Sequence, residues 1–135
     1  MNDTKTFHVD LFGRFAVVTV VFFGPVLWIM SDSVSTLLIG LAFVAIAEVG
    51  TYFVCTVVVS DNGIVLNRAN KALWHDMTAA TRVSFLGLPY LKVQRKKGMK
   101  WWIPLYLSKP EEFRQALAAK APVGNPLREY AEDSL

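Results

Sequence analysis

The sequence predicts an α+β membrane protein, in which an N-terminal two-helix transmembrane hairpin precedes a small antiparallel β domain capped by a C-terminal helix. Three observations lead to this fold class. Two long apolar runs lie near the N-terminus, at residues 11–30 and 34–59. After Val59 the sequence changes to short alternating segments separated by turn residues, which is typical of antiparallel strands. One amphipathic helical segment follows the last expected strand, as in domains that segregate strands from helices.

The second apolar run, residues 34–59, organises the chain. It is 26 residues long and carries one charged residue, Glu48. A bilayer core of about 30 Å needs roughly 20 apolar residues in a helix, so this run can span a membrane with several residues left over. We expect the helix itself at about 34–54, because the residues after Cys55 are β-branched and suit a strand.

The first run is expected to form the other membrane helix, at about residues 11–30. Pro25 lies inside it, and membrane helices tolerate proline better than soluble helices do. The Ser and Asp side chains at residues 31–33 suit the N-cap of the second helix, and so short a turn makes the two helices antiparallel. A signal peptide is the competing interpretation, but no small-x-small cleavage site follows Met30.

The distribution of basic residues predicts the orientation. Residues 15–67 contain no Lys or Arg, whereas 12 of the 14 basic residues and seven of the 11 acidic residues lie after Val59. Because Lys and Arg stay on the cytoplasmic side of short membrane proteins, both termini are expected in the cytoplasm. The single cysteine, Cys55, rules out an internal disulfide and fits a reducing compartment.

Glu48 is the one acidic residue inside the second helix, and its depth matches that of Arg14. Arg14 lies 18 residues before Asp32 and Glu48 lies 16 after it, so at 1.5 Å per residue their depths differ by only about 3 Å. Intramembrane acids usually face a partner or a cavity. Three interpretations stay open: an Arg14–Glu48 pair that locks the hairpin, a contact with a partner's membrane helix, or a proton or ion site.

A stripe of small residues runs along the second helix. It consists of Thr36, Gly40, Ala47 and Thr51. Small residues let membrane helices approach closely. The stripe is expected to receive either the first helix of the same chain or the helix of a partner.

Turn and alternation signals define the β domain, which we expect at residues 56–122. Asp61-Asn62-Gly63 predicts a hairpin turn of type I′, because Asn-Gly accepts positive φ angles. The expected core positions of the later strands are Leu91, Val93, Trp101, Ile103, Leu105 and Leu107. Residues 1–55 form the arm and hairpin, and residues 123–135 form a tail whose order the sequence leaves open.

The C-terminal helix is expected directly after the last strand. Ser108 and Glu111 have the spacing of a capping box. Phe113, Ala116 and Leu117 then fall on one helical face, which should cover the sheet.

Five short segments carry a resemblance to a known family. They are Ser60-Asp61-Asn62-Gly63-Ile64, Trp74-His75-Asp76-Met77, Ile103-Pro104-Leu105, Glu111-Glu112-Phe113 with Leu117, and Asn125-Pro126-Leu127. On these residues the segment 58–127 resembles the bacterial pleckstrin-homology-like domains attached to membrane hairpins in small inner-membrane proteins. The resemblance implies a multi-pass protein of the bacterial inner (cytoplasmic) membrane. The chain is short for the full seven-stranded barrel, so one strand is either absent or supplied by the membrane-proximal stretch.

Two surfaces of the β domain are candidates for binding. The first is a basic cluster, Lys92, Arg95, Lys96, Lys97 and Lys100, which either attracts anionic lipid headgroups or is simply a solvated hairpin. The second is an aromatic patch of Trp102 and Tyr106, which either binds a protein partner or is covered by the tail or the membrane.

Other kinds of site find no support in the sequence. His8 and His75 have no further metal ligands nearby, and no nucleophile with a placed base stands out, so neither an enzyme nor a metal or other cofactor is expected. Nucleic acid binding is not expected either, because a net charge of +5 over residues 60–135 is weak and no recognition motif is present.

These expectations favour a non-enzymatic accessory or scaffold protein that binds the lipid bilayer and another membrane protein or a second copy of itself. A narrower form is an immunity-type inhibitor of a membrane-acting toxin. One alternative is a membrane sensor that binds anionic lipids. Another is a small transporter or channel subunit, which would have to oligomerise because two helices cannot enclose a pathway.

Overall fold

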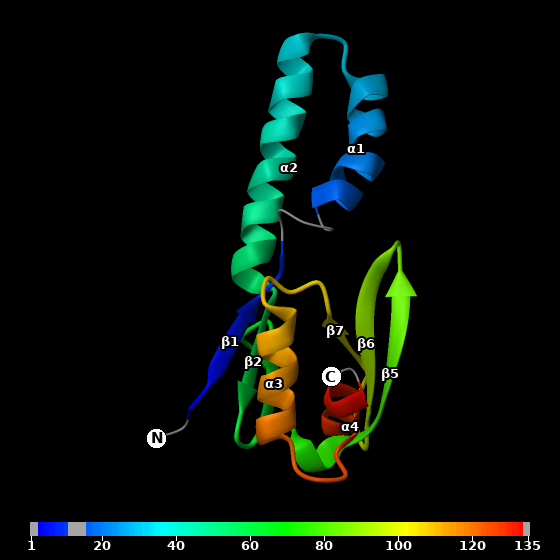
Figure 1. The fold of residues 1–135 in the computed structure, drawn as a ribbon. Coiled ribbons are helices and arrows are strands. Elements are labelled where there is room, and N and C mark those ends of the chain that lie inside the picture. The colour runs from blue at the N-terminus through cyan, green and yellow to red at the C-terminus, as the bar shows by residue number, and fades with distance from the viewer. Residues whose placement is uncertain (1–2, 11–15, 134–135) are drawn as a thin grey trace.

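The computed structural model describes residues 3–10 and 16–133, which form an apolar helical hairpin standing on one end of a β domain (Figure 1). The hairpin consists of α1 (Ala16–Met30) and α2 (Val34–Val54). The strands of the β domain are β1 (Lys5–His8), β2 (Thr56–Ser60), β3 (Gly63–Leu66), β4 (Asn70–Leu73), β5 (Met77–Phe85), β6 (Leu88–Arg95) and β7 (Trp101–Pro104). Its helices are the 3₁₀ turn Trp74–Asp76, α3 (Pro110–Lys120) and α4 (Pro126–Asp133).

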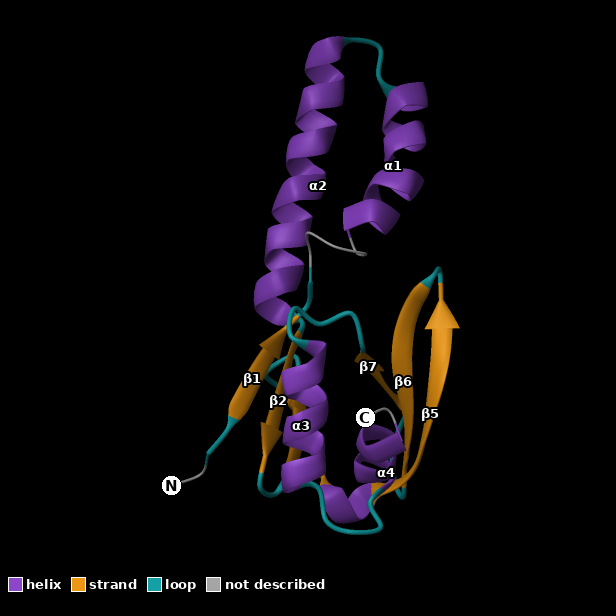
Figure 2. Cartoon of the chain, viewed as in Figure 1, coloured by secondary structure: helices purple, strands orange, loops and turns teal. Residues whose placement is uncertain are grey.

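The strands form two antiparallel sheets, in the orders β1-β2-β3-β4 and β5-β6-β7 (Figure 2). The α+β class is therefore confirmed. Helices α3 and α4 pack on the inner faces of the sheets and join them into one core. The largest fully buried side chains are Val9, Thr56, Val57, Val59, Ile64, Leu91, Val93, Ile103, Phe113, Leu117 and Leu127. The alternation that predicted an inward-facing set on β6 and β7 is confirmed for Leu91, Val93 and Ile103.

The first strand lies before the apolar hairpin, not after it. β1 pairs with β2 through Phe7↔Val57 and His8↔Thr56, and the Phe7 ring packs edge-on against Phe113 of α3 at 5.3 Å. Residues 5–8, expected in the N-terminal arm, therefore belong to the sheet, and the apolar hairpin is inserted between its first two strands. The described residues form seven strands, the first of them supplied by this membrane-proximal stretch.

The C-terminal segment is also part of the domain. Asn125 is buried; its Oδ1 accepts a hydrogen bond from Leu127 N at 3.0 Å, and its Nδ2 donates to Trp74 O at 2.8 Å. Leu127 and Ala131 of α4 lie in the core. Residues 126–133, in the tail whose order the sequence left open, thus form a second helix that packs on the core.

Leu127→Ala is expected to lower the free energy of unfolding by about 2–5 kcal/mol, because the substitution leaves a cavity in a fully buried site. The matched control is Glu129→Ala, on the exposed face of the same helix, where a change within about 0.5 kcal/mol is expected. Chemical denaturation followed by tryptophan fluorescence measures both. Equal small effects would show that α4 is not part of the folded core.

Helix α2 has the bounds that the sequence predicts. Its N-cap is Ser33, whose Oγ accepts a hydrogen bond from Thr36 N at 3.3 Å. Among the described residues it is the one helix long and apolar enough to cross a membrane, and none of its residues is buried. α1 is a shorter apolar helix of 15 residues, and the expected helical residues 11–15 lie outside the described part of the chain.

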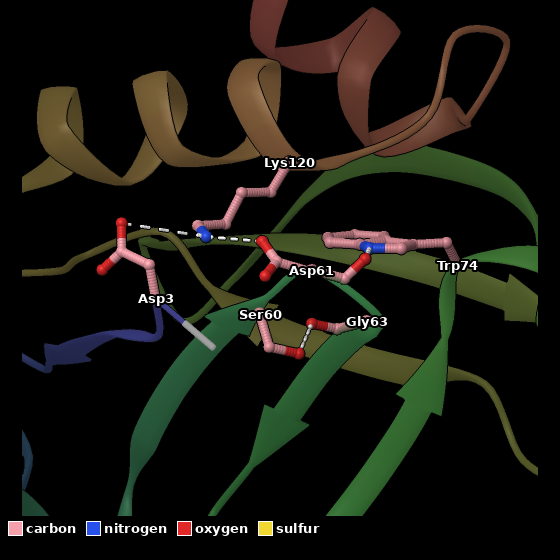
Figure 3. Close-up of polar contacts among 6 residues, drawn as sticks. All are labelled: Asp3, Ser60, Asp61, Gly63, Trp74 and Lys120. Carbon is pink, nitrogen blue, oxygen red and sulfur yellow. Dashed lines mark hydrogen bonds and ion pairs between the residues drawn. The ribbon is translucent and has the colours of Figure 1, made fainter. Parts of the chain in front are cut away.

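The β2–β3 turn differs in type from the prediction. The loop is Asp61-Asn62, neither of which has a positive φ, and Gly63 opens β3 at φ +157°. Two long-range contacts hold this turn in place (Figure 3). Trp74 Nε1 donates to Asp61 O at 2.9 Å, and Lys120 Nζ pairs with Asp61 Oδ1 at 2.7 Å. The turn is therefore fixed by the end of α3 and by the residue after β4.

Candidate functional site

The apolar hairpin contains an open groove around Glu48. Its volume is about 390 Å³, and it is lined by Thr19, Phe23, Phe43, Val44, Ala47, Glu48 and Thr51. Glu48 is half-buried there, and none of the described residues forms an ion pair or hydrogen bond with its carboxylate. Arg14, the expected partner of Glu48, lies outside the described residues. The groove thus places one carboxylate among apolar and hydroxyl side chains of both helices.

The small-residue stripe is divided between two surroundings. A Cβ at Gly40 would come within 2.7 Å of Leu27 Cδ2, so α1 packs closely against α2 at this glycine. Ala47 and Thr51 line the Glu48 groove instead, and Thr36 shares a 3.1 Å hydrogen bond with Ser33 at the turn. The stripe therefore accommodates α1 near the turn and leaves an opening nearer the β domain.

The junction between the apolar hairpin and the β domain is built from aromatic side chains. His8 of β1 stacks on Tyr52 in the last turn of α2, with ring centroids 4.5 Å apart. On the other side of the junction, Tyr106 O accepts a hydrogen bond from Asp10 N at 2.8 Å. Burial and a hydroxyl–hydroxyl hydrogen bond with Tyr90 raise the pKa of Tyr106 far above its ordinary value. Tyr106 is therefore a neutral structural group here.

The expected aromatic patch is linked through a third residue. Trp102 contacts Tyr90 at 5.7 Å between ring centroids, and Tyr90 contacts Tyr106 at 5.3 Å. Phe85 extends the row beyond Trp102, at 6.3 Å. The sequence did not single out Tyr90 or Phe85, because their contacts arise only from the pairing of β5, β6 and β7. Trp102 is exposed, whereas Tyr106 is half-buried.

The basic cluster lies at the opposite end of the β domain from α2. The β6–β7 turn, which carries Lys96 and Lys97, is at the lower end of the domain in Figure 1, and Lys96 N donates to Asp76 O there. Arg95 lies over the Trp101 ring at 4.7 Å, and Lys92 lies 6.0 Å from the Trp102 ring. Lys100 is exposed. The structure therefore does not gather these residues into one site beside the apolar hairpin.

The titratable side chains of the described part of the chain do not gather into a metal site. No group of three or more His, Cys, Asp or Glu side chains there could hold a metal ion. His75 Nε2 and Asp76 Oδ1 are 3.4 Å apart, but the His75 side chain is 70% exposed. Cys55, at the end of α2, has its pKa raised by burial, which favours the protonated thiol.

Two features thus emerge as functional candidates: the Glu48 groove and the row of aromatic side chains on the outer face of the second sheet. Comparison with known proteins finds no match to the chain among protein-family models, curated proteins or solved structures. Any function must therefore be argued from the geometry of these surfaces.

Proposed function

We propose that the apolar hairpin crosses a membrane twice and that the chain is a non-enzymatic accessory protein, binding another membrane protein through the Glu48 groove. The length, composition and lack of burial of α2 support the membrane location. The pairing of β1 with β2 argues against a signal peptide, because cleavage after the hairpin would also remove β1 from the sheet. The other crossing, which comes first in the chain, corresponds to residues 11–30. As a helix these residues would be about long enough to span the bilayer core.

The observation that carries the proposal is the position of Glu48, half-buried in an incomplete groove. An acidic side chain near the centre of a spanning helix costs about 2.5–3.5 kcal/mol to insert, so it normally faces a polar partner. The open groove has room for such a partner, between α1 and the domain-proximal half of α2. A helix presenting a basic or hydrogen-bond-donating side chain would give Glu48 a polar contact that the described residues do not provide.

The β domain fits the role of a scaffold on the cytoplasmic side. Both ends of the apolar hairpin meet the domain at one end, in agreement with the distribution of basic residues. The four- and three-stranded antiparallel sheets, with α3 and α4 after the last strand, are compatible with the resemblance to pleckstrin-homology-like domains. The place of the basic cluster, remote from α2, gives less support to the anionic-lipid sensor.

A pull-down of the full-length chain in mild detergent tests the proposal. The wild type is expected to recover a membrane-protein partner at a fixed stoichiometry, and Glu48→Ala to recover at least about tenfold less, equivalent to 1.4 kcal/mol. Glu48→Gln, which keeps hydrogen-bonding atoms, should fall between the two. The matched control is Ile46→Ala, an exposed position of α2 outside the groove.

Two results would count against the proposal. If Glu48→Ala recovered as much partner as the wild type, the groove would not be the binding site. Recovery of the wild type alone, as a monomer by light scattering, would remove the partner altogether. A homo-oligomer that dissociates in Glu48→Ala would identify a second copy of the chain as the occupant of the groove.

A further inference from the structure

The tip of the β5–β6 hairpin, residues 85–88, is an exposed apolar surface on a domain that has few of them. Phe85 is 56% exposed and Leu86 is 54% exposed. Trp102 of β7, 44% exposed, lies beside Phe85 and extends this surface. The other large apolar side chains exposed on the described β domain, Met99 and Val123, stand singly. A contiguous exposed apolar patch usually marks a contact surface.

The backbone of the tip supplies an independent observation. Phe85 and Leu88 pair across a two-residue turn, in which Leu86 has φ +52° and Gly87 has φ +77°. Two successive positive φ angles are typical of a type I′ turn, whose first position favours Asn, Asp or Gly. A leucine in this conformation is disfavoured by contact between its Cβ and the backbone. Stability of the turn therefore does not explain Leu86, and an outlier of this kind points to a function.

The position of the tip identifies what it would touch. Tyr90, paired with Val83 just below the tip, shares a 2.9 Å hydrogen bond with Tyr106. The main-chain oxygen of Tyr106 accepts a hydrogen bond from Asp10 N, and Asp10 lies two residues after His8, which pairs with Thr56 directly after α2. Tyr90 therefore lies near the end of the domain from which α2 leaves.

The tip extends beyond the level of Tyr90. A strand advances about 3.3 Å per residue, so Phe85 lies about 7 Å further along than Val83. In Figure 1 the tip points toward the end of the domain from which α2 leaves. It therefore reaches in the direction of the bilayer that would surround α2.

We propose that the tip enters the interface of the bilayer and is a third membrane contact beside the two helices. Its occupant is lipid: Phe85 and Leu86 lie at the boundary of the acyl chains, and Trp102 and Tyr90 lie at headgroup level, where amphipathic aromatic side chains concentrate. This inference rests on the proposed membrane crossing of α2, but it does not depend on a partner at Glu48. A third contact away from the axis of the helices would fix the tilt of the domain against the membrane.

The test uses the full-length chain in vesicles of phosphatidylcholine and phosphatidylglycerol. With Cys55→Ser as background, Leu86→Cys carries an environment-sensitive fluorophore, and Met99→Cys, 85% exposed and next to the basic turn, is the matched control. Nitroxide-labelled lipids are expected to quench the label at residue 86 severalfold more strongly than the label at residue 99. Equal quenching at the two positions would overturn the inference. A label at residue 86 that is shielded from iodide, yet not quenched by the lipids, would place the tip against protein and would also overturn it.

Two further measurements separate this inference from the proposed function. Extraction of the vesicles with alkaline carbonate reports whether the chain is integral: an extractable chain overturns both proposals, whereas a resistant chain with an unquenched residue 86 overturns only this one. Leu86→Asn is expected to raise the Tm of the detergent-solubilised protein by a few degrees, because asparagine tolerates the positive φ. In the vesicles, a label at residue 85 should then lose most of its lipid quenching. If the tip had only a structural role, Leu86→Asn would raise the Tm without reducing the lipid quenching at residue 85.

Discussion

Gly63→Ala is expected to destabilise the β domain by about 3 kcal/mol or more, a large fraction of the free energy of unfolding of a small domain. A Cβ at this position would lie 2.0 Å from the Ala72 carbonyl oxygen and 2.9 Å from Leu73 Cα. Both atoms belong to the backbone of β4, so no side chain can rotate to make room. Relief of the clash would have to separate β3 from β4, and Ile64, next in the chain, lies in the core.

The matched control is Gly87→Ala in the same protein. Gly87 also has a positive φ, +77°, but nothing lies within 4 Å of a Cβ built there. Its substitution should cost only about 1 kcal/mol, for the left-handed backbone. Thermal unfolding in detergent, followed by tryptophan fluorescence, to which Trp74 beside the turn contributes (Figure 3), measures the difference. Similar losses for the two variants would show that the approach of β4 is not what requires Gly63.

Residues 56–135 alone are expected not to fold, whereas residues 3–10 joined to 55–135 by a short Gly/Ser linker should give a folded domain. Without β1 the edge of β2 is unpaired, and exposed edges promote aggregation. The core also loses the side chains of Phe7, 4% exposed, and Val9, 2% exposed. The loss of Phe7 alone should cost about 3–5 kcal/mol, by analogy with Phe→Ala substitutions in cores.

The linked form is feasible because His8 and Thr56 are directly opposite each other in the sheet. In NMR spectra, the linked domain is expected to show well-dispersed amide resonances. The fragment 56–135 is expected to show poorly dispersed resonances. A further variant, the linked domain with Phe7→Ala, should retain the strand but lose stability. A well-folded 56–135 fragment would refute the role of β1.

The elements that local signals define were predictable, and those defined by distant contacts were not. The bounds of α2 follow from an unbroken apolar run and its cap at Ser33, both visible in the sequence. β1 is four residues long, and its identity as a strand depends on β2, which lies beyond two helices. For α4 the sequence does contain a signal, with Asn125 before Pro126 and apolar residues at 127 and 131, although residues 123–135 were expected to be a tail.

The capping box at Ser108 shows how a tertiary contact can override a local pattern. Helix α3 begins at Pro110, with Lys109 at its N-cap and no side-chain cap, because Ser108 Oγ donates to His8 O at 3.3 Å. Candidate site residues that depend on tertiary structure are likewise hard to predict from the sequence. Glu48 and Trp102 stand out by residue type, whereas Leu86 does not, since a leucine is not a signal for a left-handed turn.

The insertion of two helices between β1 and β2 also constrains the order of events during synthesis. β1 leaves the ribosome first, and at about 5–20 residues per second its neighbour β2 follows only after some seconds. Phe7 must wait still longer for Phe113, more than a hundred residues later in the chain. The helices are therefore complete before the sheet can close around their ends. Closure of the sheet then ties the chain before α1 to the chain after α2, so folding of the β domain holds together the two ends of a hairpin that is already made.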